Sequence, residues 1–273
     1  MISLRERSAR VIAVTSGKGG VGKTNISVNL SVALARLGKD AMLVDGDMGM
    51  ANANILLGMN ATTTIADVLA RDCGLEDVVQ QGLSGVRIVP GHSGSGILPG
   101  LDRNDRRRLA EAFRPYAGKL DHIIVDTASG IYPEAMELVA SSDMILVVLS
   151  AEPTAFMDAY ALVKVLSLDH GCNAVSVVTN MVEDETSGRA LFQHFSEVVR
   201  RFLPIRLSHL GSVPRDDHVR ESVFRKRCCL EAYPDSRASA AFTRIARVVA
   251  DAELPATEGG DRFFGMEVLH GAC

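Results

Sequence analysis

A glycine-rich segment near the beginning of the chain constrains its fold more than any other feature. Residues 17–24 read GKGGVGKT and satisfy the pattern G-x-x-x-x-G-K-[ST]. The segment lies between an apolar run at residues 11–15 and a helical repeat of apolar residues, so it joins a strand to a helix. Glycines let backbone N–H groups converge on phosphate oxygens, and the helix directs its positive end at the same anion. The pattern therefore predicts a phosphate-binding loop.

The pattern also predicts roles for individual side chains of the loop. Lys23 is expected to reach the β- and γ-phosphates of ATP, and the Thr24 hydroxyl is expected to ligate Mg²⁺. Lys18 occupies a variable position, where the pattern alone favours a solvated side chain. ATP or ADP with Mg²⁺ are thus the expected cofactors. The residues expected to contact the nucleotide here are Gly17, Lys18, Gly19, Gly20, Val21, Gly22, Lys23, Thr24 and Asn25.

Three carboxylates follow apolar runs. Asp45 and Asp47 close the run at residues 41–44, and Asp126 closes the run at residues 122–125. In an open parallel sheet ligands bind at the carboxyl ends of the strands, so all three should face the loop. Asp47 is a candidate for orienting the attacking water, and Asp47 and Asp126 are expected to hold Mg²⁺ through water. Asp45 has a second interpretation, as a structural partner of a loop lysine.

Similar apolar runs recur along the chain, and each is followed by a helix-like stretch. The runs are apolar throughout rather than alternating, as in strands that are covered on both faces. Gly38 is a helix stop, and Thr64 with Asp67 forms a capping box. We therefore predict an α/β fold, a doubly wound and mostly parallel sheet with helices on both faces. The runs cover residues 11–15, 41–44, 86–89, 122–125, 144–149, 174–179 and 207–213.

Length and composition fit one globular domain. Of 273 residues, 47% are hydrophobic, and the net charge of -4 argues against nonspecific binding to nucleic acid. We expect one domain over residues 1–252 and a connector with a short tail over residues 253–273, where proline and paired glycines occur. The five scattered cysteines contain no C-x-x-C and are expected to be reduced thiols. The first ten residues lack the apolar core of a secretory signal, so we expect a cytoplasmic protein.

Polar residues also follow the later runs. Glu152 comes after the run at residues 144–149, where an acid at a helix start is favoured by the helix dipole alone. Asn180 ends the next run, and its amide offers the donor and acceptor that suit an adenine edge. Pro214 and Arg215 follow the last run and are further candidates for nucleotide contact. An asparagine or proline at a strand end is often only a turn former, so both interpretations stay open.

The loop, read from Lys18 to Thr24, resembles the deviant Walker A motif of the MinD/ParA ATPases. The resemblance implies an ATP-sandwich homodimer in which Lys18 reaches the phosphates of the partner. It also implies that Asp47, in switch I, positions the attacking water. Residues 128–130 then resemble switch II, which senses the γ-phosphate.

The same resemblance extends to the later candidates. It implies that Glu152 lies at the dimer interface near the nucleotide of the partner, that Asn180 reads adenine, and that Pro214 lies in the segment that closes over the base.

Within this family the chain is similar to the FlhG (also FleN) group, over about residues 11–264. The resemblance implies an ATP-dependent homodimer that limits flagellar number as antiactivator of a FleQ-type transcription activator. It also implies contacts with FlhF and with flagellar C-ring components, and no specific binding of nucleic acid. The segments that carry it are residues 49–54, 56–58, 86–90, 158–162, 168–171, 219–220, 231–234 and 236–239.

Several positions depart from the group. Gly46 and Met48 stand where alanine and leucine are usual, and Ser129 stands where switch II has alanine or glycine. Only ten residues precede the first run, without the segment that engages FlhF. Residues 262–269 lie where MinD-like proteins have an amphipathic membrane helix. Their apolar residues spread around a helix, which favours at most weak attachment at the inner face of the plasma membrane or the cell pole.

Two other classes of function are compatible with such a loop. The first is a positioning ATPase, with either a MinD-like role in choosing the division site or a ParA-like role in positioning DNA or cargo. The negative net charge argues against the DNA-segregation form of this class. A redox or metal-cluster carrier would need cysteines at the subunit interface, and no cysteine follows residues 126–130 closely. An ATP-gated switch is therefore the leading interpretation.

Overall fold

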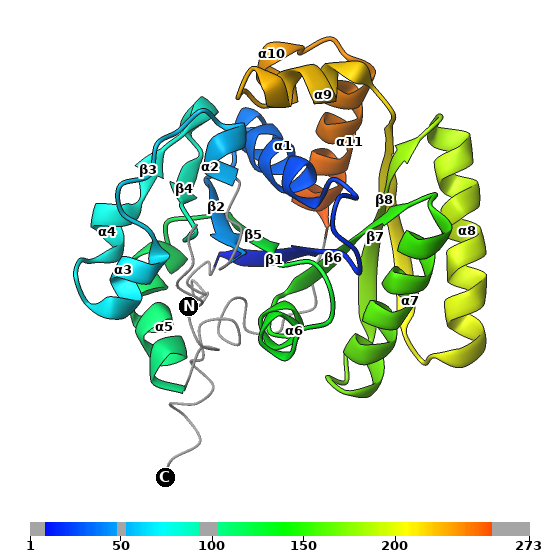
Figure 1. The fold of residues 1–273 in the computed structure, drawn as a ribbon, viewed down its shortest axis with the longest axis horizontal. Coiled ribbons are helices and arrows are strands. Elements are labelled where there is room, and N and C mark those ends of the chain that lie inside the picture. The colour runs from blue at the N-terminus through cyan, green and yellow to red at the C-terminus, as the bar shows by residue number, and fades with distance from the viewer. Residues whose placement is uncertain (1–8, 48–52, 93–102, 253–273) are drawn as a thin grey trace, which may run out of the picture.

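The seven apolar runs form seven strands of one eight-stranded sheet in the computed structural model, and the short polar β3 is the eighth (Figure 1). The structure describes residues 9–47, 53–92 and 103–252. The strands follow the order β3-β4-β2-β5-β1-β6-β7-β8; β3 runs antiparallel to β4, and the other neighbouring pairs are parallel. The prediction of a mostly parallel sheet is confirmed. The strands are β1 (Arg10–Thr15), β2 (Ala41–Gly46), β3 (Gln80–Gln81), β4 (Arg87–Val89), β5 (His122–Thr127), β6 (Met144–Ser150), β7 (Ala174–Val182) and β8 (Arg206–Pro214).

Both faces of the sheet are covered, which explains why central strands such as β1 and β6 are almost wholly apolar. In β1, Ile12 and Val14 pack into one core cluster, whereas Val11 and Ala13 pack into clusters on the opposite face. All four are fully buried. The prediction of helices on both faces is therefore confirmed.

Eleven helices are assigned among the described residues. The first face carries α1 (Lys23–Arg36), α2 (Ala53–Leu56), α9 (Asp217–Phe224), α10 (Cys229–Ala232) and α11 (Arg237–Asp251). The second carries α3 (Ile65–Ala70), α4 (Leu75–Val78), α5 (Arg103–Ala117), α6 (Pro133–Ala140), α7 (Pro153–Leu168) and α8 (Glu185–Phe202). A short 3-10 helix, η1 (Leu83–Gly85), precedes β4.

Local signals set the ends of the helices as predicted. α1 ends where Gly38 adopts φ +78°, and the Lys39 N–H donates to the Leu34 carbonyl at 3.1 Å. α3 begins at its capping box, where the Thr64 N–H donates to Asp67 Oδ2 at 2.6 Å.

The topology fixes the position of the functional site. β1 lies between β5 and β6 in the sheet. From β1 the chain continues to β2 on the β5 side, whereas β6, β7 and β8 are added on the other side, so the strand order reverses next to β1. Open α/β sheets bind ligands at the carboxyl ends of the strands at such a switch point. The segment after β1 is the phosphate-loop candidate, which therefore lies where a ligand is expected.

Two further expectations concern the cysteines and the tail. Cys73, Cys172, Cys228 and Cys229 are free thiols, as predicted. Cys273, Met48 and the proposed tail at residues 253–273 lie outside the described residues, so the domain boundary at residue 252 stays a prediction. Within the ranges that the structure describes, no helix combines the length and the apolar character needed to span a membrane.

Candidate nucleotide site

The loop between β1 and α1 adopts a shape that requires its glycines. Gly20 and Gly22 have φ of +83° and +89°, which L side chains rarely adopt. A Cβ at Gly17 would lie 2.2 Å from the backbone of Asp158 in α7. Gly22 is the N-cap of α1, so the loop ends at the positive end of that helix. This is the geometry that a phosphate cradle needs.

Lys23 and Asp126 form a buried ion pair next to the loop. Lys23 Nζ lies 3.2 Å from Asp126 Oδ1, and the two side chains are 9% and 2% exposed. Ser27, one turn along α1, donates to the same oxygen at 2.8 Å. Removing one partner of a buried ion pair lowers the free energy of unfolding by about 3–5 kcal/mol, because the other charge is left buried and unpaired. The pair and the Ser27 hydrogen bond therefore hold both side chains in place. The loop and the end of β5, 103 residues apart in sequence, thus form one polar centre.

Asp45 connects the two ends of the segment that contains Asp47. Its Oδ1 accepts from the Asp47 N–H at 3.2 Å, and its Oδ2 accepts from the Ala53 N–H at 2.9 Å, where α2 begins. Asp45 is fully buried and lies opposite Asp126 in the β2–β5 register. Burial, and then the charge of Asp126, raise the pKa of the Asp45 carboxyl to about 7. Asp45 thus has structural contacts with the N–H groups of Asp47 and Ala53, in addition to any contact with a loop lysine. The sequence does not indicate these N–H contacts.

This raised pKa predicts a pH dependence of stability. Between the ordinary aspartate pKa of 3.8 and about 7, the folded protein binds the Asp45 proton more tightly than the unfolded chain. The free energy of unfolding should therefore fall as the pH rises through this window. Without nucleotide and Mg²⁺, raising the pH from about 5 to about 8 should lower the Tm of the natural chain more than that of Asp45→Asn.

His122 titrates in an overlapping range with the opposite sign, because burial lowers its pKa to about 4. Its contribution is common to both proteins and cancels in the difference between them. Equal pH slopes for the natural chain and Asp45→Asn would contradict the assignment.

Lys18 is held within its own chain. Its Nζ lies 2.9 Å from Glu152 Oε2 and 2.8 Å from Thr154 Oγ1, at the start of α7. The lysine and glutamate side chains are 39% and 65% exposed, so the ion pair is worth at most about 1 kcal/mol. Lys18 and Glu152, which the resemblance assigns to a dimer interface, therefore contact each other in one subunit. The pair is weak enough to open.

The segment that resembles switch II lies against the loop. The Gly130 N–H donates to the Ser16 carbonyl at 2.9 Å. Ser129 Oγ lies 3.5 Å from the position of a Cβ on Gly19. Ile131 and Tyr132, which follow, are 50% and 66% exposed. The segment thus joins the loop to two exposed apolar side chains.

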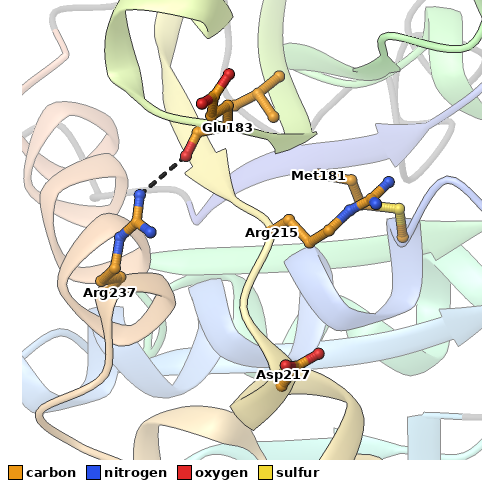
Figure 2. Close-up of a pocket in the computed structure, with 6 residues that line it drawn as sticks. Met181, Glu183, Arg215, Asp217 and Arg237 are labelled. Carbon is orange, nitrogen blue, oxygen red and sulfur yellow. Dashed lines mark hydrogen bonds between the residues drawn. The ribbon is translucent and has the colours of Figure 1, made fainter.

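A cavity of about 430 Å³ opens near the other side of the loop (Figure 2). Asn180 is 6% exposed, and its Nδ2 donates to the Val21 carbonyl at 2.7 Å. Met181, the next residue, reaches within 3.4 Å of the position of a Cβ on Gly22, so the cavity begins beside the loop. The lining residues are Met181, Val182, Glu183, Arg215, Asp217 and Arg237.

Two arginines shape this cavity. The Arg215 N–H donates to the Val182 carbonyl at 2.7 Å, and Figure 2 shows its side chain beside Met181. Arg237 of α11 donates to the Glu183 carbonyl at 2.9 Å, drawn dashed. Pro214 is buried at the end of β8, directly before Arg215. The volume and the mixed polar and apolar lining suit a small planar group such as a base.

Most of the predicted residues thus lie around the loop, and sequence reasoning missed several of their partners. Ser27 could have been found, because it lies four residues after Lys23 and therefore on the same side of α1. Thr154 follows Glu152 by two residues, but no pattern pairs it with Lys18. Met181, Asp217 and Arg237 come from three different elements or connections, and no spacing links them.

The arrangement fits a magnesium nucleotide. The loop offers backbone N–H groups at a helix start, Lys23 offers a cation, and Thr24, a half-buried residue in the first turn of α1, offers a hydroxyl. Carboxylate and hydroxyl oxygens are the ligands that Mg²⁺ prefers. The fold and the site define a P-loop nucleotide-binding protein.

The chain belongs to the CobQ/CobB/MinD/ParA nucleotide-binding family, whose model matches residues 12–228. It is 44% identical to antiactivator FleN of Pseudomonas aeruginosa over 260 residues, 95% of this chain and 93% of that protein. It is 28% identical to the flagellum site-determining protein YlxH of Helicobacter pylori over 240 residues, 88% and 81% of the two chains.

A solved structure with the same fold is that of the septum site-determining protein MinD of Pyrococcus horikoshii, complexed with Mg-ADP. It has a TM-score of 0.71 at 28% identity, over 89% of this chain and 96% of that one. The predicted resemblance to the MinD/ParA ATPases is confirmed. The protein is a nucleotide-binding ATPase of this type.

Proposed function

We propose that this protein is an ATP-gated dimeric switch that limits the number of flagella by inhibiting an activator of flagellar gene transcription. The similarity to antiactivator FleN, over 95% of the chain, supports a transcription activator as the protein that is inhibited. The phosphate loop with Lys18 supports the mechanism. ATP then acts as a clamp between two subunits rather than as the substrate of a metabolic reaction.

In this proposal the residues around the loop bind the nucleotide. Lys23, which pairs with Asp126 in this structure, would contact the β- and γ-phosphates, and Thr24 would ligate Mg²⁺. Asp126 and Asp47 would help to hold Mg²⁺, and Asp47 would orient the attacking water. Mg²⁺ neutralises charge on the phosphates when it is bound.

The cavity beside the loop takes the base. Met181 and Arg215 supply surfaces for the ring, and Pro214 fixes the backbone that carries Arg215. Asn180 braces the loop through Val21 and so links the base site to the phosphate site.

The observation that carries the switch is the contact of Lys18 with Glu152 and Thr154. In the single chain this contact satisfies the lysine. In the ATP dimer, Lys18 leaves it to reach the phosphates of the partner, where several negative charges compete with one exposed carboxylate. Lys18 therefore has two positions in this proposal: one on Glu152 and Thr154 of its own chain, held weakly, and one on the phosphates of the partner, held more strongly.

Two variants test this element. Lys18→Ala should leave ATP binding to the monomer within about threefold and weaken ATP-dependent dimerisation by about tenfold or more, as expected for one lost interfacial ion contact. Glu152→Gln should weaken the hold on Lys18, which is worth at most about 1 kcal/mol, and so leave dimerisation unchanged or up to about fivefold stronger. Light scattering with ATP and with ADP measures both. A Lys18→Ala protein that dimerises normally would exclude the clamp.

A deletion strain tests the biological role. Loss of the gene should give cells with more flagella than the parent, and the chain carrying Lys23→Ala should not restore the number. Minicells would favour the division-site alternative, and loss of plasmids would favour DNA or cargo positioning.

Finer partners follow from the FlhG resemblance alone. We propose contacts with FlhF and C-ring components, and weak, ATP-dependent attachment to the inner face of the plasma membrane through residues 253–273. Flotation of the ATP-loaded chain with anionic vesicles, against a chain ending at residue 252, tests the attachment. Equal flotation of the two would refute it.

A further inference from the structure

The turn between α9 and α10 carries the most exposed large apolar side chain of the described residues. Phe224, the last residue of α9, is 76% exposed. Its neighbours Val219 and Val223 instead pack against the core. An aromatic ring that projects from a well-packed turn costs solvation free energy in the isolated chain, and such rings often serve as anchors at interfaces.

Basic side chains surround this ring. The Arg220 guanidinium lies 5.7 Å from the centroid of Phe224. Arg225, Lys226 and Arg227 follow it directly and are exposed. Arg227 is paired with Glu231 at 2.6 Å, whereas Arg225 lies over the Tyr233 ring at 5.1 Å. The turn is therefore locally basic on a chain whose net charge is -4.

The turn also contacts the segment that follows switch I. A Cβ on Gly58, just after α2, would lie 2.8 Å from the Lys226 carbonyl oxygen. Both residues adopt positive φ, +66° and +52°, so two tight turns meet backbone to backbone. Ile55, whose carbonyl accepts from the Gly58 N–H, is 48% exposed. Each of the two chain segments that meet here thus carries an exposed apolar side chain within three residues of the contact, Ile55 before Gly58 and Phe224 before Lys226.

Hydrogen bonds connect this region to the nucleotide site by two routes. Asp45 holds the first N–H of α2 and the N–H of Asp47. Asn29, a buried residue of α1, accepts from the Leu230 N–H of α10 at 3.0 Å. The helix that starts at the phosphate loop and the helix that follows switch I are therefore both tied to the α9–α10 turn.

We propose that Ile55, Arg220, Phe224, Arg225 and Lys226 form a docking surface for an acidic segment of a protein partner that carries an apolar anchor. Phe224 and Ile55 contact the anchor, and the three basic side chains pair with carboxylates around it. Because α2 borders the surface, docking depends on the nucleotide; this dependence, unlike the docking itself, rests on the proposed switch function.

Charge favours a protein segment over nucleic acid. Glu221 and Glu231 lie among the basic residues, and a continuous run of phosphates would meet these carboxylates as well. A folded protein segment can place its carboxylates selectively. A bilayer is also disfavoured, because α9 has eight residues and presents one exposed aromatic ring rather than a long apolar face.

Selection of peptides tests the surface without knowledge of the partner. A random 12-residue peptide library on phage is selected on the full chain with a non-hydrolysable ATP analogue and counter-selected on Phe224→Ala. Enriched peptides should carry an aromatic or aliphatic residue flanked by Asp or Glu. Their Kd should rise about tenfold for Phe224→Ala and for Arg225→Glu, as for one anchor residue.

Phe202→Ala is the matched control. Phe202 is 63% exposed and carries Arg201 at 5.5 Å from its ring, but it lies at the end of α8. This variant should bind the peptides like the natural chain, and Phe224→Ala should keep natural ATPase activity, which excludes misfolding.

Three outcomes would overturn the docking proposal: no enrichment of acidic peptides, equal losses for Phe202→Ala and Phe224→Ala, or tighter Phe224-dependent binding of duplex DNA or of phosphatidylglycerol vesicles. Affinity for the peptides should be about tenfold higher with the ATP analogue than with ADP. Equal affinities would refute the coupling through α2, whereas the ATPase measurements decide the switch function separately.

Discussion

Replacing Lys23 with alanine is expected to abolish ATP binding, with a rise in Kd of about 100-fold or more. Lys23 is the cation at the centre of the loop, and its side chain is only 9% exposed. Truncating a buried, hydrogen-bonded partner of a charged group costs about 2–5 kcal/mol or more, which is about 30-fold to several thousandfold in affinity. Isothermal titration with ATP and Mg²⁺ measures the change.

The variant also leaves Asp126 without its lysine, so stability must be measured with binding. Asp126 keeps the hydrogen bond from Ser27, which limits the loss. The Tm of the ligand-free variant shows whether the chain still folds. Lys119→Ala, an exposed lysine after α5, is the matched control and should bind ATP normally. A folded Lys23→Ala chain with unchanged affinity would refute the phosphate-loop assignment.

The sequence predicts the scaffold well because its signals are local. Each strand buried on both faces needs a run of apolar residues, and every residue of the run at 144–149 is buried in β6. Glycines with positive φ, such as Gly20 and Gly22, are likewise required by backbone conformation. The two-residue β3 has no such signal, since Gln80 and Gln81 are polar and pair only at the edge.

The contacts within the site are less predictable because they join distant parts of the chain. The family resemblance implies that Lys18 and Glu152 both lie near a nucleotide, but only the folded chain brings the start of α7 within 2.9 Å of the lysine. The contact from Asn180 Nδ2 to the Val21 carbonyl, formed because the end of β7 packs against the loop, has no signal in the sequence, and the role of Asn180 in reading a base stays a prediction. Asp45 accepts from two N–H groups, those two and eight residues further along the chain, and no motif encodes this pair of contacts.

These contacts add to what the phosphate-loop motif predicts about function. A loop and a lysine alone predict ATP binding. Lys18 held in its own chain, and Asp45 shared between Asp47 and α2, describe a site that has a resting arrangement and a connection to the surface. A switch needs both features, because a ligand shifts an equilibrium only through contacts that differ between two states.

Asp47→Ala should separate binding from turnover. Asp47 lies at the end of β2, where its N–H is held by Asp45, so its position is fixed by a buried neighbour. Loss of the group that orients the attacking water should lower kcat by about 100- to 10,000-fold. ATP affinity should change by less than about threefold, because the phosphates are bound by the loop and Lys23.

The control is Asp40→Ala, which removes an exposed carboxylate directly before the opposite end of the same strand and should leave turnover unchanged. A second readout separates catalysis from a loss of switch I structure. If Asp47 acts on the water, the variant should bind ATP, dimerise and stay dimeric by light scattering, whereas the natural chain returns to monomer as ATP is consumed. Normal hydrolysis would assign catalysis to another residue, and a variant that binds ATP but stays monomeric would show that Asp47 serves the clamp rather than the chemistry.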